Sequence, residues 1–319
     1  MEGERPLVSV IIPTYDRPEM LVEAVESVVA QDYPSLELIV VDDGSSSPAE
    51  EALSGVVPDG FAFRCLRHET NRGANAARTT GIREANGDVL AFLDDDDRWK
   101  PEKIGIQVSA LRDDDIGVAI VGQEFTTKHG ERTTIQLPDV DPAATESLLG
   151  NAVAGPFSTI AVEASVVEET GPPDERFPAW QDREWLLRLS RHCRFESIRR
   201  PLVVRRIGRY EQIGDRFEPL RDVSYPLYVE KHRELAALYG REREFLARRA
   251  MSIACAGLAN GYYADARRFA LRAIRTYPPL RDAYLYLFIA LIGPHAYRSA
   301  SQVKRTVERS RRSIRGSIP

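Results

Sequence analysis

Four consecutive aspartates, Asp94 to Asp97, follow directly after an apolar run. Neighbouring carboxylates repel one another, and burying them without partners is costly. Hard divalent cations prefer oxygen ligands, and magnesium-type sites often combine one or two carboxylates with substrate phosphates. In an extended backbone Asp94 and Asp96 have the same strand parity and point to one side. The run therefore predicts a metal site; the competing hypothesis is a solvated acidic loop in which Asp97 caps a helix that begins near Pro101.

Two further polar clusters also follow apolar runs. PTYDR comes after Leu7–Ile12, and DDGSS comes after Leu36–Val41. Both runs are rich in β-branched residues and predict buried strands, as do Phe61–Arg67 and Val89–Leu93. Helical patterns lie between these strands, which favours a mostly parallel α/β sheet. Because ligands bind beyond the carboxyl ends of such strands, we expect the three polar clusters to form one site.

Each of the smaller motifs is weak when taken alone. Asp43 lies in an Asp-Asp-Gly-Ser segment, and these are ordinary turn residues, although a carboxylate there could also accept hydrogen bonds from a base or sugar. Arg78 could contact a diphosphate, or it could be a charge on a helix surface.

The ordered set of motifs is far more specific. VSVIIPTYDR, LELIVVDDGS, NRGANAARTTGI and GDVLAFLDDDD, in this order from about Val8 to Ile104, resemble the N-terminal half of family 2 glycosyltransferases. A looser resemblance covers Glu169–Leu189. The resemblance implies an inverting enzyme with the GT-A fold, which is a Rossmann-like, mostly parallel sheet flanked by helices.

The resemblance also implies roles for individual residues. Pro13, Tyr15 and Asp43 would line the pocket for the nucleotide base, and Arg78 would lie near the nucleotide or its phosphates. Asp94 and Asp95 are placed with the donor-binding residues. Asp96 is the favoured ligand of a divalent cation, Mn²⁺ or Mg²⁺, within the DXD motif.

Asp182 matches the catalytic base of the family. The alternative is that Asp182 is the N-cap of the helix that follows it. The sequence departs from the family in two places. Gly171–Glu175 reads GPPDE where members often have GGFDE. Many members also carry a histidine after the base, and Arg205–Asp215 has none. Asp174 and Glu175 could help to bind the acceptor or could be loop charges.

Composition and charge limit the remaining possibilities. The three cysteines are scattered and predict neither a metal site nor a disulfide framework. The N-terminus lacks a signal-type pattern, which predicts a cytoplasmic protein. The segment Lys231–Pro319 carries 18 Lys and Arg against 6 Asp and Glu, a net charge of +12, whereas the first 230 residues carry −17. No nucleic-acid motif accompanies the basic residues, so nucleic-acid binding is not expected.

The chain is thus predicted to have a catalytic domain at residues 1–220 and an α-helical extension at 221–319. Ala259–Pro278 resembles one tetratricopeptide-like hairpin. The basic helices predict either peripheral contact with anionic lipid or packing on the catalytic domain.

The predicted function is metal-dependent, hexosyltransferase-like transfer of a sugar from a nucleotide-sugar, UDP- or GDP-linked, to a glycan or lipid-linked acceptor. The setting would be surface polysaccharide assembly or protein glycosylation. Alternatives are a metal-dependent nucleotidyltransferase and a non-catalytic nucleotide-sugar-binding or scaffold protein.

Overall fold

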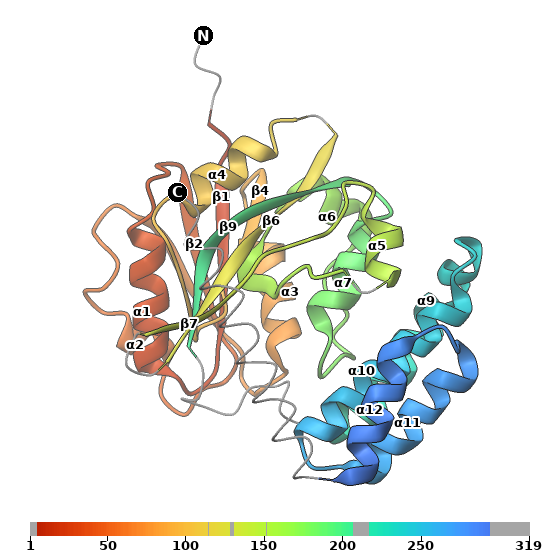
Figure 1. Cartoon of the computed structure of the whole chain (residues 1–319). Coiled ribbons are helices and arrows are strands. Elements are labelled where there is room, and N and C mark those ends of the chain that lie inside the picture. Colours follow the sequence, from red (N-terminus) through yellow and green to blue (C-terminus); the bar gives the residue numbers. More distant parts are fainter. Residues whose placement is uncertain (1–4, 114, 128–130, 151, 207–216, 294–319) are drawn as a thin grey trace, which may run out of the picture. The chain divides into compact units, whose positions relative to one another are not determined.

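The computed structural model describes residues 5–293 except 114, 128–130, 151 and 207–216 (Figure 1). The chain divides into two compact units, residues 1–211 and 212–319. The boundary at residue 220 expected from the sequence stays a prediction.

The first unit contains one mixed sheet of nine strands. Its order is β3 (Ala62–Arg67), β2 (Leu36–Asp42), β1 (Val8–Thr14), β4 (Val89–Phe92), β8 (Ile160–Glu163), β6 (Ile116–Thr126), β9 (Arg194–Arg206) and β5 (Asp97–Trp99), with β7 (Arg132–Gln136) paired to β6. The first four strands are mutually parallel, while β8 runs antiparallel to both β4 and β6. The expected α/β sheet is confirmed, with antiparallel pairs added at β8, β7 and β5.

Helices cover both faces of the parallel part. Alternate residues of β1 and β2 point to opposite faces. On one face Ile12 and Val40 join a core that includes side chains of α1 (Pro18–Val29) and α4 (Lys103–Ala110). On the other face Ile39 packs with Ala77 of α3 (Ala74–Glu84). The other α-helices among the described residues of this unit are α2 (Ala49–Ala52), α5 (Ala144–Gly150), α6 (Ala164–Thr170) and α7 (Gln181–Leu189).

Two of the local alternatives raised by the sequence are wrong. Helix α4 has Glu102 at its N-cap, and Asp97 lies in β5, so Asp97 is not a helix cap. Helix α7 has Trp180 at its N-cap, so Asp182 is not a cap either. Both aspartates therefore remain available for another role.

The second unit is helical. It contains α8 (Phe217–Pro219), a π-helical turn (Leu220–Ser224), α9 (Tyr225–Leu238), α10 (Glu242–Ala259), α11 (Tyr263–Thr276) and α12 (Arg281–Ile292). The hairpin predicted for Ala259–Pro278 is wrong in its bounds, because that range holds a single helix, α11, and α10 already ends at Ala259. Ala266, Phe269, Ala270 and Ala273 form the buried side of α11. None of the helices among the described residues has the length and apolar character to cross a membrane. The basic segment Val303–Arg315 lies outside the described residues.

Candidate active site

The three polar clusters meet at one edge of the sheet. The backbone N–H of Asp43 donates to the carbonyl oxygen of Thr14 at 2.9 Å, which joins the ends of β1 and β2. The Thr14 hydroxyl donates to Asp95 Oδ2 at 2.8 Å, which joins the end of β1 to the aspartates beyond β4. The convergence expected from a parallel sheet is confirmed.

Asp94, Asp95 and Asp96 form a turn that leads into β5 at Asp97, and not a continuous extended strand. The N–H of Asp97 donates to the carbonyl oxygen of Asp94 at 3.0 Å. This turn brings carboxylate oxygens of Asp94, Asp96 and Asp97 within 4.8 Å of one another. A hard divalent cation prefers such an all-oxygen set, so these residues fit a Mg²⁺ or Mn²⁺ ion. Asp97 was missed as a candidate because its contribution depends on the turn.

Arg17 holds two of the aspartates. Its Nη1 atom lies 3.1 Å from Asp95 Oδ1 and 3.3 Å from Asp96 Oδ2. Burial raises the pKa of Asp95 to about 6, although Arg17 opposes the shift. Burial also raises the pKa of Asp96, and the charge of Asp94 adds to the effect. The sequence placed Arg17 in the correct loop, but nothing local indicated its partners.

Asp97 is held by two residues that are distant from it in the sequence. Its Oδ2 atom accepts from the Ser158 hydroxyl at 2.7 Å, and its Oδ1 atom accepts from Arg205 Nε at 3.2 Å. Asp97 and Arg205 face each other in the register between β5 and β9. Burial raises the pKa of Asp97 to about 7, against the effect of Arg205.

Arg78 connects three parts of the site. It is 3% exposed, and its guanidinium donates to Asp94 Oδ1 at 2.5 Å, to Asn75 Oδ1 at 3.1 Å and to Gln181 Oε1 at 3.2 Å. It also lies over the ring of Phe157, 3.9 Å from the centroid. Arg78 is therefore not a helix-surface charge, because it joins α3, the aspartate turn and α7.

The second residue of α7 is Asp182, the predicted base. Its carboxylate accepts from the N–H of Arg183 at 2.7 Å. Burial raises the pKa of Asp182, the charge of Asp94 raises it further, and the charge of Arg78 lowers it. These effects place Asp182 within electrostatic range of Asp94 and Arg78. A carboxylate with a raised pKa suits proton abstraction near neutral pH.

Trp180, at the start of the same helix, has an unusual backbone. Its φ is +60°, in the left-handed region that large side chains rarely adopt. The α7 start is therefore a specialised turn, and it presents Asp182 within the following helical turn.

Asp43 organises the loop that precedes α3. It is 3% exposed, and its oxygens accept from His68 Nδ1 at 2.7 Å, from the N–H of Arg72 at 2.9 Å and from the N–H of Gly73 at 2.7 Å. Pro13 is buried within β1, whereas Tyr15 is 45% exposed. The role of these three residues in a base pocket stays a prediction.

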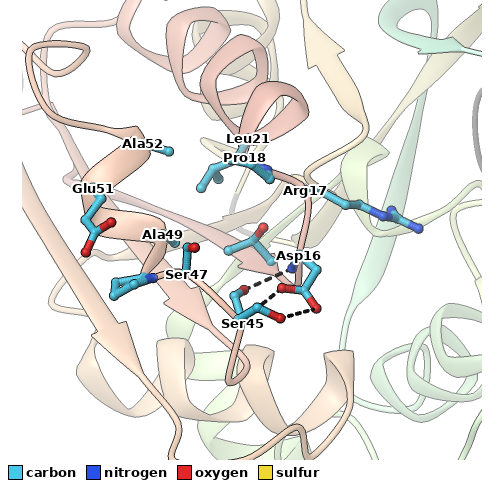
Figure 2. A pocket seen from close by; sticks show the side chains of 12 residues that line it. Asp16, Arg17, Pro18, Leu21, Ser45, Ser47, Ala49, Glu51 and Ala52 are labelled. Carbon is cyan, nitrogen blue, oxygen red and sulfur yellow. Dashed lines mark hydrogen bonds between the residues drawn. The ribbon is translucent and has the colours of Figure 1, made fainter.

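A cavity of about 320 Å³ lies between the start of α1 and the loop that joins β2 to α2 (Figure 2). Asp16 forms part of its wall, and its Oδ1 atom accepts from the N–H of Ser46 at 2.7 Å. Arg17 also lines the cavity. The cavity is thus next to the aspartate turn, although none of the four aspartates lines it.

The Asp174–Glu175 segment packs against the start of α3. Asn75 Nδ2 donates to the carbonyl oxygen of Asp174 at 2.8 Å, and Arg72 lies 3.6 Å from Glu175. The Asp174 carboxylate is held by Arg176 at 2.7 Å. Asp174 therefore has a structural partner in its own loop.

Residues 9–155 match the sequence model of glycosyl transferase family 2. The mixed sheet with helices on both faces is that of a GT-A fold, and residues 9–155 within it are similar to glycosyl transferase family 2.

Particular relatives give the family a narrower context. A putative teichuronic acid biosynthesis glycosyltransferase, TuaG from Bacillus subtilis, is 32% identical over 130 residues, which are 41% of this chain and 52% of that protein. The chain spans about half the length of such curated relatives.

Solved structures confirm the fold. Residues 1–349 of S. aureus TarS in complex with UDP-GlcNAc superpose with a TM-score of 0.62 at 18% identity, covering 96% of this chain and 92% of that one. The mannosyltransferase PcManGT from Pyrobaculum calidifontis, in complex with GDP-Man and Mn²⁺, gives a TM-score of 0.57 at 19% identity, covering 92% and 88%.

Proposed function

We propose that this protein is an inverting glycosyltransferase that moves a sugar from a nucleotide-sugar to a glycan or lipid-linked acceptor in surface polysaccharide assembly. The observation that carries the proposal is the joint placement of Arg78, the aspartate turn and Asp182 at one edge of the sheet. The UDP-GlcNAc and GDP-Man in the solved relatives support a nucleotide-sugar donor, and the teichuronic acid relative supports the setting.

Asp94, Asp96 and Asp97 are the residues that would hold a divalent cation, because their oxygens converge. Such a cation, Mn²⁺ or Mg²⁺, would offset negative charge on the departing nucleoside diphosphate. Arg78 already lies beside Asp94 and would add its own positive charge to that stabilisation.

Asp182 would then act on the acceptor. Its carboxylate accepts the proton of an acceptor hydroxyl while the hydroxyl oxygen attacks the anomeric carbon. The bond from that carbon to the diphosphate oxygen breaks, and its electron pair leaves with the diphosphate. A single displacement inverts the anomeric configuration and needs no covalent enzyme intermediate.

The first experiment measures thermal stabilisation by nucleoside diphosphates and nucleotide-sugars, each with and without Mn²⁺ or Mg²⁺. A ligand that binds the folded state raises its apparent stability. We expect one nucleotide to stabilise the protein in a metal-dependent manner, and we expect Asp96→Ala to remove that effect.

The second experiment tests the base with donor turnover. Asp182→Asn should lower turnover by about a hundredfold or more and leave stabilisation by the nucleotide largely unchanged. Asp59→Asn, an exposed loop substitution, is the matched control and should retain full turnover. Unchanged turnover in Asp182→Asn would refute the assignment of the base.

The same assays separate the alternatives. A glycosyltransferase releases a nucleoside diphosphate, whereas a nucleotidyltransferase releases pyrophosphate. A scaffold that only binds nucleotide-sugar would show stabilisation without release of either product.

A further inference from the structure

The outer side of α12 is a continuous apolar surface. Ten large apolar side chains are exposed among the described residues, and half of them lie on this one helix. They are 48 to 64% exposed, and they are Tyr284, Leu285, Phe288, Leu291 and Ile292, here called the α12 stripe. At 3.6 residues per turn this spacing covers an arc of about 120°. The stripe is therefore a single surface and not a scatter of isolated side chains.

The opposite side of α12 is also apolar, but it is occupied. Ile289 and Ala290 pack with Leu258 of α10 and Ala266 of α11. The stripe is thus not the side with which α12 joins its own helical unit. Exposed apolar patches of this kind mark interaction sites, since water contact with them is unfavourable.

The stripe carries no charge along its length. From Ala283 to Gly293 the sequence has no Asp, Glu, Lys or Arg. The 12 residues of α12 make a helix of about 18 Å, and the hydrocarbon layer of a bilayer is about 30 Å thick. A helix with these dimensions suits a position in the plane of the lipid–water interface.

Positive charge lies on the neighbouring helix and in the sequence that follows α12. The neighbouring helix α11, which lies alongside α12 (Figure 1), exposes Arg268, Arg272 and Arg275 on one side together with Leu271. Residues 294–319, which follow α12 in the sequence, contain seven Lys and Arg and one Glu, a net charge of +6. Each basic residue near an anionic membrane surface contributes about 1 kcal/mol of attraction.

This charge also argues against a second copy as the partner. Self-association through α12 would bring together two segments that each carry +12 over Lys231–Pro319. Like charges at an interface are unfavourable, whereas anionic lipid head groups are complementary to the same residues.

We propose that the α12 stripe and the exposed arginines of α11 dock the helical unit on an anionic lipid bilayer. The stripe enters the boundary between head groups and acyl chains, and Arg268, Arg272 and Arg275 face lipid phosphates. This surface lies outside the candidate active site, so the docking holds or fails independently of the proposed reaction.

The test is co-flotation of the full chain with lipid vesicles. One set consists of phosphatidylcholine alone, and the other contains phosphatidylglycerol as well. We expect binding to the anionic vesicles, weak or no binding to the neutral ones, and a marked loss of binding at high salt.

Two variants divide the apolar contribution from the charged one. Leu285→Ser/Phe288→Ser/Leu291→Ser should weaken binding roughly tenfold or more at any salt concentration. Arg268→Gln/Arg272→Gln/Arg275→Gln should weaken it mainly at low salt. Leu238→Ser/Tyr239→Ser is the matched control, because these apolar residues are exposed elsewhere, at the end of α9.

Several outcomes would overturn the proposal. One is a folded wild-type monomer that does not bind anionic vesicles. Another is a triple serine variant at Leu285, Phe288 and Leu291 that binds them as well as wild type does. A dimer that this variant abolishes would identify a second copy as the occupant. Asp182→Asn should float like wild type, which separates docking from catalysis.

Discussion

Replacing Arg78 should destabilise the first unit substantially, because Arg78 joins α3, the aspartate turn and α7. The side chains of Arg78 and Asp94 are 4% and 25% exposed. Removing one partner of a buried ion pair costs about 3–5 kcal/mol, and the partial exposure of Asp94 reduces that figure. The hydrogen bonds to Asn75 and Gln181 add about 1 kcal/mol each before water replaces them. For Arg78→Met we therefore expect a loss of about 3 kcal/mol in the free energy of unfolding.

The measurement is thermal and urea unfolding followed by circular dichroism, with a chelator present. A loss of this size lowers Tm by about 6–12 °C in a unit of roughly 200 residues. Arg83→Met is the matched control, because Arg83 is an exposed arginine on the same helix, and it should change stability by less than about 0.5 kcal/mol.

A third variant separates charge from geometry. Arg78→Lys keeps the positive charge but cannot reproduce the planar fork that reaches three partners, so we expect an intermediate loss. If Arg78→Met were no more destabilising than Arg83→Met, the contacts of Arg78 with the aspartate turn and α7 would add nothing to the free energy of unfolding. Our reasoning would then be wrong.

Two further predictions concern stability. The pKa values of Asp95 and Asp97 are raised to about 6 and about 7, so the stability they contribute is full below their ordinary pKa values and is lost as pH rises through 6 to 7. In chelator, the free energy of unfolding measured with urea should fall by about 2–4 kcal/mol between about pH 5 and about pH 8. Asp97→Asn should make this dependence on pH weaker. A free energy of unfolding that rises with pH would contradict the prediction. At Trp180, whose φ is +60°, glycine should be more stable than alanine by about 1 kcal/mol in thermal unfolding, and the opposite order would show that the turn is not strained.

The sequence was sufficient for the parts of the site that depend on local pattern. The β-branched run before Pro13 predicted β1, and the runs before Asp43 and Asp94 predicted β2 and β4. Since parallel strands end at one edge, the meeting of these clusters followed from strand order alone. The position of Asp182 near the start of a helix was also correct to within a residue.

The partners of the aspartates could not be predicted in the same way. Arg205 is 108 residues from Asp97, and their contact depends on the register between β5 and β9. β5 has only three residues and no apolar pattern of its own, so neither the strand nor its pairing has a local signal. Arg17 lies in the correct loop, but its contact with Asp95 and Asp96 follows from the turn that those residues adopt.

The four aspartates are tolerated because arginines from three distant elements approach them. Arg17 holds Asp95 and Asp96, Arg78 holds Asp94, and Arg205 holds Asp97. This compensation is incomplete, because the pKa values of Asp95, Asp96 and Asp97 remain above the ordinary range despite it. If these residues contributed only to stability, a fold with fewer buried carboxylates would be more stable. The residual negative charge therefore favours a further cation as the partner of this turn, and the anionic diphosphate of a donor would increase that demand.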